Sequence, residues 1–189
     1  MSAVQIRKAE FIRGNKLALR NATVKDAAFI LSLRTNQEKS RHLSRVSDDL
    51  SEQVTWLRAY VERDTEAYLI IEDLKGSQLG TVRLYDAQVD SFCWGSWILT
   101  DSAPSTAAIE SALIVYTYAL ESLGFDRSHF QVRKANERVW KFHERFGAER
   151  VSENDVEYEY TISNISIRSS IDKYRRYLPN GIIIAEPLK

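Results

Sequence analysis

The sequence contains few of the residues that build cross-linked, metal-bound or highly charged proteins. Its 189 residues include one cysteine, three prolines and seven glycines, and 26 Lys and Arg residues balance 26 Asp and Glu residues. The single cysteine, Cys93, excludes an internal disulfide framework and a cysteine-rich zinc site. A net charge of zero provides no broad attraction to nucleic acid or to an anionic membrane. We therefore expect no nucleic-acid partner, no membrane partner and no metal.

Long hydrophobic runs and linkers are also missing. No stretch approaches the ~18 consecutive apolar residues of a transmembrane helix, and residues 1–16 lack the apolar core of a signal peptide. Glycine and proline do not cluster, and no repeat or low-complexity tract divides the chain. At this length, these features predict one domain in the cytoplasm.

Hydrophobic patterns and turn residues predict an alternation of strands and helices. Strands are expected at 17–20, 67–73, 79–86, 91–99, 128–133 and 156–162. Helices are expected at 23–34, 50–61, 106–122 and 136–146. In the second helix, Leu50, Val54, Leu57 and Val61 have the spacing of one buried face. The order predicts an α/β fold, with helices on both faces of a mixed, largely antiparallel sheet.

The pattern changes after residue 163. Ile167, Ile171, Tyr174 and Leu178 recur at helical spacing, and three isoleucines at 182–184 suggest a last strand. We therefore divide the chain into a domain at 1–163 and a helix–strand extension at 164–189. The extension is expected to pack on the domain or on a partner subunit, which makes a homodimer plausible.

Two stretches carry a resemblance to a known family. The first runs from a strand through a loop into a long helix, at 97–123, and the second reads ValArgLysAlaAsn and continues into a helix that ends in PheGly, at 132–148. Together with the preceding order of elements, they make residues 17–163 similar to the GCN5-related N-acetyltransferases (GNAT). The resemblance implies an enzyme that transfers acetyl from acetyl-coenzyme A to a primary amine.

The same resemblance assigns the coenzyme contacts. The backbone of Trp97, Ile98 and Leu99 is expected to pair with the pantetheine arm, and Asn136 to lie beside it, although Asn136 could also be a helix N-cap. The loop expected to bind the pyrophosphate consists of Ser105, Thr106, Ala107, Ala108 and Ile109. Ala107 and Ile109 stand where the family has glycines. A module that binds coenzyme A without catalysis, or a structural protein, is therefore the alternative.

His143 occupies the position at which many family members carry a catalytic tyrosine. The resemblance implies that His143 is the general acid for the departing thiolate, and a nearby carboxylate such as Glu144 could raise its pKa. The alternative is a histidine packed under its helix. Trp94 and Trp97, three residues apart in a strand, are expected to face opposite sides. Cys93 is expected to be a small buried hydrophobic residue.

The acceptor side is expected to include polar clusters at 34–36, 53–56 and 83–86. A looser resemblance connects the chain with acetyltransferases that act on nucleotide-linked amino sugars or on ribosomal proteins. We therefore expect a small-molecule amine, with a nucleotide-linked amino sugar as the first choice and a protein N-terminus as the second.

Overall fold

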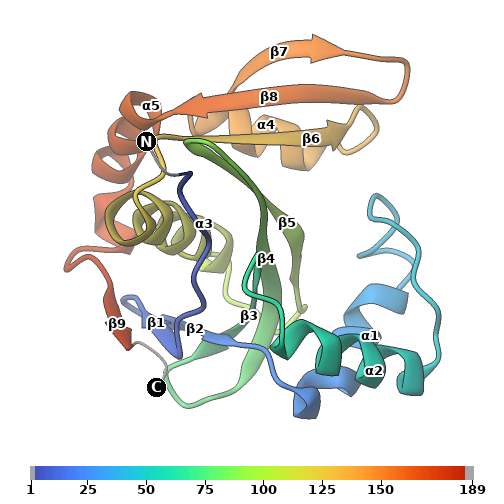
Figure 1. The fold of residues 1–189 in the computed structure, drawn as a ribbon. Helices are drawn as coiled ribbons and strands as arrows, with labels where there is room; N and C mark the ends of the chain where they lie inside the picture. The colour runs from blue at the N-terminus through green and yellow to red at the C-terminus, as the bar shows by residue number, and fades with distance from the viewer. Residues whose placement is uncertain (1–2, 186–189) are drawn as a thin grey trace.

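The computed structural model describes residues 3–185, and one sheet organises them (Figure 1). Its strands are β1 (Phe11–Arg13), β2 (Leu17–Asn21), β3 (Ala67–Asp73), β4 (Gln78–Gln88), β5 (Ser91–Leu99), β6 (Arg127–Arg133), β7 (Glu149–Glu153), β8 (Glu157–Ser163) and β9 (Ile183–Ala185). The helices are α1 (Ala27–Thr35), α2 (Leu50–Val61), α3 (Ala107–Thr117), α4 (Glu137–Arg145) and α5 (Asn164–Lys173). A π-helical segment, Tyr118–Leu123, extends α3 to Gly124. None of these helices is long and apolar enough to cross a membrane.

The strand order is β7-β8-β6-β5-β4-β3-β2-β1-β9. Every neighbouring pair is antiparallel except β5 and β6, which run parallel. The mixed, largely antiparallel sheet predicted from the sequence is therefore confirmed. The same is true of the helix and strand that follow residue 163.

Helices cover both faces of the sheet. The larger hydrophobic cluster joins α3, α4 and α5 to one face, and the smaller one joins α1 and α2 to the other. Figure 1 shows α3 and α5 on one side of the central strands and α1 with α2 on the opposite side. Burial on both faces explains why β3 is an almost continuous hydrophobic run.

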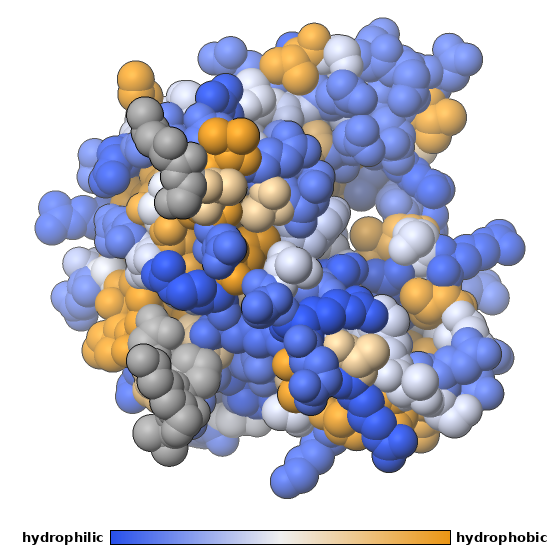
Figure 2. Space-filling view, in the orientation of Figure 1, coloured by the Kyte–Doolittle hydropathy of each residue, from blue (hydrophilic) through white to orange (hydrophobic). Residues whose placement is uncertain are grey.

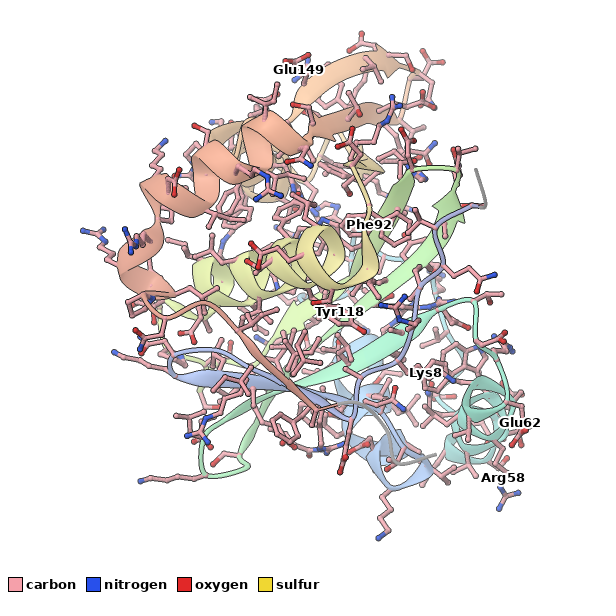
Figure 3. The ribbon with its side chains drawn as sticks, turned by 60° about the vertical axis from the view of Figure 1, so that its left-hand side comes forward. Lys8, Arg58, Glu62, Phe92, Tyr118 and Glu149 are labelled. Carbon is pink, nitrogen blue, oxygen red and sulfur yellow. The ribbon has the colours of Figure 1, made fainter. Side chains whose placement is uncertain are left out.

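The N-terminal segment is hydrogen-bonded to the end of α2. Lys8 Nζ donates to the carbonyls of Tyr60 and Val61, at 2.7 and 3.0 Å, and these are the last carbonyls of α2. Figure 3 shows Lys8 beside this end of the helix, near Glu62. A cation at a helix C-terminus satisfies free carbonyls and stabilises the helix dipole.

Two details differ from the sequence-based expectations. In α2, Leu50 and Val61 are exposed, whereas Leu57 and Tyr60 are buried. The ring of Tyr60 stacks on Trp56, and the Tyr60 hydroxyl accepts a hydrogen bond from the Tyr68 amide at 2.8 Å. The buried face of α2 is therefore the one that carries these aromatic residues. The strands β1 and β7 were not predicted, since one has three residues and the other is exposed along its whole length.

The C-terminal extension packs on the same chain. Ile167 and Leu178 are buried in the larger cluster, and Ile171 and Tyr174 pack against it. The strand β9 pairs with β1, with Phe11 opposite Ala185 and Arg13 opposite Ile183. It adds one strand to the sheet. The predicted apolar stripe is therefore covered within the chain. Residues 186–189, which complete the predicted extension, lie outside the described residues.

Ile167 and Ile165 provide a matched test of this packing. They lie two positions apart, and Ile167 is 0% exposed whereas Ile165 is 81% exposed. We expect Ile167→Ala to lower the free energy of unfolding by about 2–5 kcal/mol, because it leaves a cavity. Ile165→Ala should change it by less than about 0.5 kcal/mol. Urea unfolding measures both values, and equal losses would show that α5 does not pack on the core.

Candidate active site

The site begins where β5 and β6 separate. The two strands pair only at Ser91 with Arg127 and at Phe92 with Ser128. Beyond these pairs, the β5 edge that faces β6 has no strand partner among residues 3–185. A cavity of about 110 Å³ lies in the opening, lined by Trp94, Gly95, Ser96 and Trp97 from β5 and by residues 130–133 from β6. An unpaired strand edge of this kind can form β-type hydrogen bonds with an extended ligand.

A bulge in β5 shapes this edge. Ser96 has a φ of 47°, and the register between β4 and β5 shifts between Thr81 and Arg83. As a result, Trp94 and Trp97 lie on the same side, with ring centroids 5.2 Å apart. The expectation that they face opposite sides was wrong, because a bulge breaks the two-residue period of a strand. A side chain at Gly80 would clash with the Ile98 carbonyl, so β4 needs glycine here.

The end of β5 leads into the predicted pyrophosphate loop, 105–109, at the N-terminus of α3. The Ala107 amide donates to the Pro104 carbonyl at 2.8 Å. Within the described residues, the amides of Ala108 and Ile109 have no backbone acceptor. Ala107 is buried in the core, and the Ile109 side chain packs against it. The two residues that replace glycines therefore direct their side chains inward, which is compatible with an anion at the helix N-terminus.

Asn136 and His143 reach the smaller cavity from opposite ends of α4. Asn136 occupies the N-cap position, but its side chain makes no capping hydrogen bond within the described chain. Its backbone carbonyl instead accepts from Val139 and Trp140, at 3.1 and 3.2 Å. The structure therefore does not show the Asn136 side chain in the capping role that was the alternative.

His143 lies in an aromatic enclosure and is 5% exposed. Its ring centroid is 4.2 Å from Phe130 and 5.2 Å from Trp94. Burial lowers the pKa of His143 to about 3, and its Nδ1 has no hydrogen-bond partner among residues 3–185. Glu144 points elsewhere, because it pairs with Arg150 at 3.0 Å and accepts from Tyr160 at 2.9 Å. The expectation that Glu144 raises the pKa of His143 was wrong.

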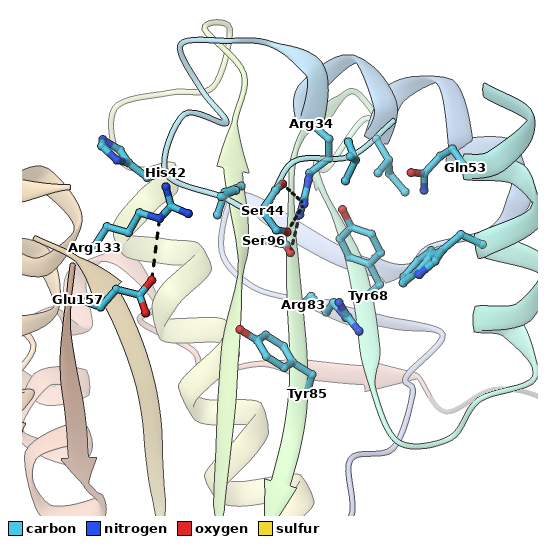
Figure 4. A pocket seen from close by; sticks show the side chains of 14 residues that line it. Arg34, His42, Ser44, Gln53, Tyr68, Arg83, Tyr85, Ser96, Arg133 and Glu157 are labelled. Carbon is cyan, nitrogen blue, oxygen red and sulfur yellow. Dashed lines mark hydrogen bonds and ion pairs between the residues drawn. The ribbon is translucent and has the colours of Figure 1, made fainter. Parts of the chain in front are cut away.

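A second cavity, of about 540 Å³, opens on the opposite face of the sheet from α3. Figure 2 shows the surface hollowed between the part built from β6–β8 and the part built from α1, α2 and the loop at 36–49. The lining comes from eight segments (Figure 4) and consists of Ile30, Arg34, His42, Leu43, Ser44, Val46, Gln53, Trp56, Tyr68, Arg83, Tyr85, Ser96, Arg133 and Glu157. It includes members of all three polar clusters expected on the acceptor side.

The lining is rich in cations and aromatic rings. Arg83 pairs with Glu66, a buried carboxylate that also pairs with Arg63, and lies 5.1 Å from the centre of the Tyr85 ring. Arg133 lies 3.9 Å from Glu157. Three arginines against one lining carboxylate, Glu157, give the cavity a positive character. A positive, partly aromatic pocket favours an anionic ligand that carries a flat ring.

The two cavities share five lining residues, His42, Leu43, Ser96, Arg133 and Glu157. Burial, and to a lesser extent Arg41 and Arg133, lower the pKa of His42, so this histidine is neutral at pH 7 and can accept a proton. Sequence reasoning did not find His42 or Glu157. The reason is that His42 lies in a loop without periodicity, and Glu157 is one of two alternating glutamates on β8.

Neighbouring groups do not suggest other chemistry at this site. Cys93 is buried as expected, and burial raises its pKa to about 11, so it remains a thiol at neutral pH. In the part of the chain that the structure describes, no three His, Cys, Asp or Glu side chains form a group that could hold a metal ion.

Comparisons with known proteins agree with this geometry. Residues 16–149 match the Acetyltransferase (GNAT) domain family. The structure of apo FdhC, described as a nucleotide-linked sugar GNAT, is 37% identical over 94% of this chain and 99% of its own, with a TM-score of 0.80. A comparison with curated protein sequences gave no match.

More distant structures share the fold alone. A GCN5-related N-acetyltransferase from Brucella melitensis is 14% identical over 93% of this chain and 88% of its own, with a TM-score of 0.77. Spermidine N-acetyltransferase from Vibrio cholerae, in complex with CoA and spermine, is 16% identical over 81% and 98%, with a TM-score of 0.71. The family match, the similarity to FdhC and the separated strands lead to one conclusion: the chain belongs to the GCN5-related N-acetyltransferase family.

Proposed function

We propose that this acetyltransferase acts on the amino group of a nucleotide-linked amino sugar. The observation that carries the proposal is the cavity of about 540 Å³ with three arginines and the rings of Trp56, Tyr68 and Tyr85. Arginines fit phosphate oxygens, and aromatic rings offer surfaces on which a base can stack. The similarity to FdhC, a nucleotide-linked sugar GNAT, supports the same acceptor class. A protein N-terminus is the weaker candidate, because its positive charge matches that of the lining.

Membership of the family implies acetyl-coenzyme A as the acetyl donor. We propose that the amides of Ala108 and Ile109, assisted by the hydroxyls of Ser105 and Thr106, hold its pyrophosphate. The free edge of β5 from Trp97 to Leu99 would hold the pantetheine arm beside Asn136. When bound, acetyl-coenzyme A supplies the thioester from which acetyl is transferred.

The remaining roles fall to side chains around the smaller cavity. Neutral His42 and the carboxylate of Glu157 lie where the cavities meet, so either can accept the proton that the attacking amine loses. Trp97 is held in place by a bond from its indole N–H to Ser111 at 3.2 Å. We propose that His143, which is neutral at its lowered pKa, donates one N–H to the departing sulfur.

The context of the activity is proposed on the same basis. Use of acetyl-coenzyme A and a lone free thiol are consistent with action in the cytoplasm. We place the acetyltransferase in residues 1–163 and regard 164–189 as an extension that packs on it. A homodimer through the extension stays a prediction, and β9, with Ile183 exposed, is the edge at which it would form.

The acceptor class is tested by turnover. We expect release of free coenzyme A when the protein is given acetyl-coenzyme A and a uridine- or thymidine-diphosphate-linked amino sugar. The same amino sugar without its nucleotide should react with a kcat/KM lower by a factor of about 10²–10⁴, because the phosphate contacts are lost. Equal turnover of the two would contradict the proposed acceptor. Binding of coenzyme A without turnover of any amine would favour the non-catalytic alternative.

The role of His143 is tested by two substitutions. His143→Phe should lower kcat by a factor of about 10²–10⁴ with little change in coenzyme affinity, since it removes the donor but keeps the packing. His143→Tyr should restore part of the rate, because a phenol retains an O–H donor. Phe146→Leu is the packing control, and it should change stability more than kcat. Unchanged turnover in His143→Phe would show that the departing sulfur does not need the N–H of His143.

Burial of His143 also predicts a pH dependence of stability. The unfolded histidine titrates near pH 6.5 and the folded one near pH 3, so the unfolded state binds more protons between these values. Stability should therefore fall as the pH decreases. Between pH 7 and pH 5 the wild type should lose about 2 kcal/mol more than His143→Phe. Urea unfolding at both pH values measures this difference. Phe146→Leu removes no titratable group, and as a control it should keep the pH dependence of the wild type.

A further inference from the structure

Arg34 differs from the other two arginines of the larger cavity. Arg83 is paired with Glu66, and Arg133 lies within 4 Å of Glu157. Arg34 has no carboxylate partner within residues 3–185, and its charged neighbours there include Arg83. Its pKa is lowered, chiefly by burial. A partly buried cation without a counter-charge is costly, and an anionic ligand is the natural group to compensate it.

The position of the guanidinium is fixed by neutral groups (Figure 4). Its NH1 donates to Ser96 Oγ at 3.0 Å, and its NH2 donates to the carbonyl and Oγ of Ser44 at 2.8 and 2.9 Å. The buried Nε has no acceptor in the described chain. Since an arginine has five N–H donors, these contacts leave donors unused. The side chain is therefore oriented in advance, with one N–H of NH1 and the full charge left for a ligand.

The placement of Arg34 says which part of a ligand it would meet. Its partner Ser96 lines both cavities, so Arg34 stands near the point where the acceptor must meet the acetyl donor. In a nucleotide-linked sugar, the diphosphate lies between the sugar and the nucleoside. When the sugar amine reaches the junction, the diphosphate follows directly behind it. Trp56, Tyr68 and Tyr85 continue the lining and can meet the nucleoside.

We propose that Arg34 binds the diphosphate of the acceptor and selects a nucleotide-linked amine over a neutral one. This inference rests on the acceptor class proposed above and names the residue that recognises the diphosphate of that acceptor. Arg83 and Arg133 each lie beside a carboxylate, so they offer a ligand less uncompensated charge than Arg34 does. The ligand chemistry that Arg34 recognises is a diphosphate, which can compensate the guanidinium charge and accept from the N–H that remains on NH1.

Binding of ligand fragments tests the inference without relying on turnover. Uridine and thymidine diphosphates, the corresponding nucleosides and inorganic pyrophosphate are titrated into the protein with coenzyme A already bound, which keeps the fragments out of the donor site. We expect Arg34→Gln to weaken nucleoside diphosphate binding by about 10- to 150-fold, the range for hydrogen bonds to charged groups. Nucleoside affinity should change by less than about twofold, since the nucleoside has no charged group that Arg34 could bind.

Two further variants separate recognition from folding. Arg34→Lys keeps the charge but loses the planar guanidinium that Ser44 and Ser96 orient, and it should retain part of the affinity. Arg45→Gln removes an exposed arginine of the loop at 36–49, which follows α1, and this arginine does not line the cavity. The variant should bind as the wild type does. Coenzyme A affinity and the unfolding temperature report whether each variant is folded. An Arg34→Gln variant that loses nucleoside and nucleoside diphosphate binding equally would show a structural role and overturn the inference.

The remaining outcomes distinguish the two proposals. If a nucleotide-linked amino sugar is acetylated and Arg34→Gln leaves its KM unchanged, the inference fails and the acceptor class stands. If nucleoside diphosphates bind through Arg34 and no nucleotide-linked amino sugar is acetylated, the acceptor class fails and the inference stands. Failure of the wild type to bind any nucleoside diphosphate overturns the inference.

Discussion

The separation of β5 from β6 after two residue pairs is the constraint on which the rest of the site depends. Strands that pair along their whole length satisfy each other's peptide groups, whereas strands that diverge leave an edge that needs other partners. The edge from Trp94 to Leu99 is held in place by β4 behind it, and β6 is held by seven pairs to β8. The fold therefore keeps a hydrogen-bonding edge open inside a rigid sheet.

The bulge at Ser96 connects this edge with the acceptor side. A non-glycine residue at positive φ costs on the order of 1–3 kcal/mol and persists only where its surroundings hold it. Here, the Ser96 carbonyl accepts from Thr81 at 2.9 Å, and its hydroxyl accepts from Arg34. One contact comes from the neighbouring strand and the other from α1, on the acceptor face. The strand geometry that the acetyl donor would use is thus partly stabilised by a side chain that lines the acceptor cavity.

Regular elements could be predicted from the sequence, and their irregularities could not. The strands at 67–73 and 91–99 have the predicted bounds, because β-branched and aromatic residues fill them and turns flank them. The strand β7 has no buried residue and so no pattern to detect. Trp94 and Trp97 were assigned to opposite faces because periodicity assumes an unbroken strand. The bulge depends on contacts from Thr81 and Arg34, which are distant in the sequence.

The candidate site was predicted unevenly for a similar reason. Residues on α3, α4 and β5 could be located because the family resemblance lies in these elements. The lining of the larger cavity could not be predicted from the sequence, because its residues come from α1, α2, a loop, and strands of both halves of the sheet. His42 shows the limit clearly. Nothing in its loop predicts a position at the junction of two cavities, because that position results from how the loop packs across β5.

The histidine at position 143 changes what the smaller cavity can do with a proton. A tyrosine at this place would be protonated at neutral pH and could give its proton to the departing thiolate. Burial lowers the pKa of His143 to about 3, so this histidine is also uncharged at neutral pH. It can donate an N–H hydrogen bond, but it carries no additional proton to give to sulfur. Its contribution in the proposed mechanism is therefore a directed dipole in an aromatic enclosure, where electrostatic interactions are strong. The proton that finally reaches sulfur then comes from solvent or from the amine, by way of the junction at which His42 and Glu157 lie.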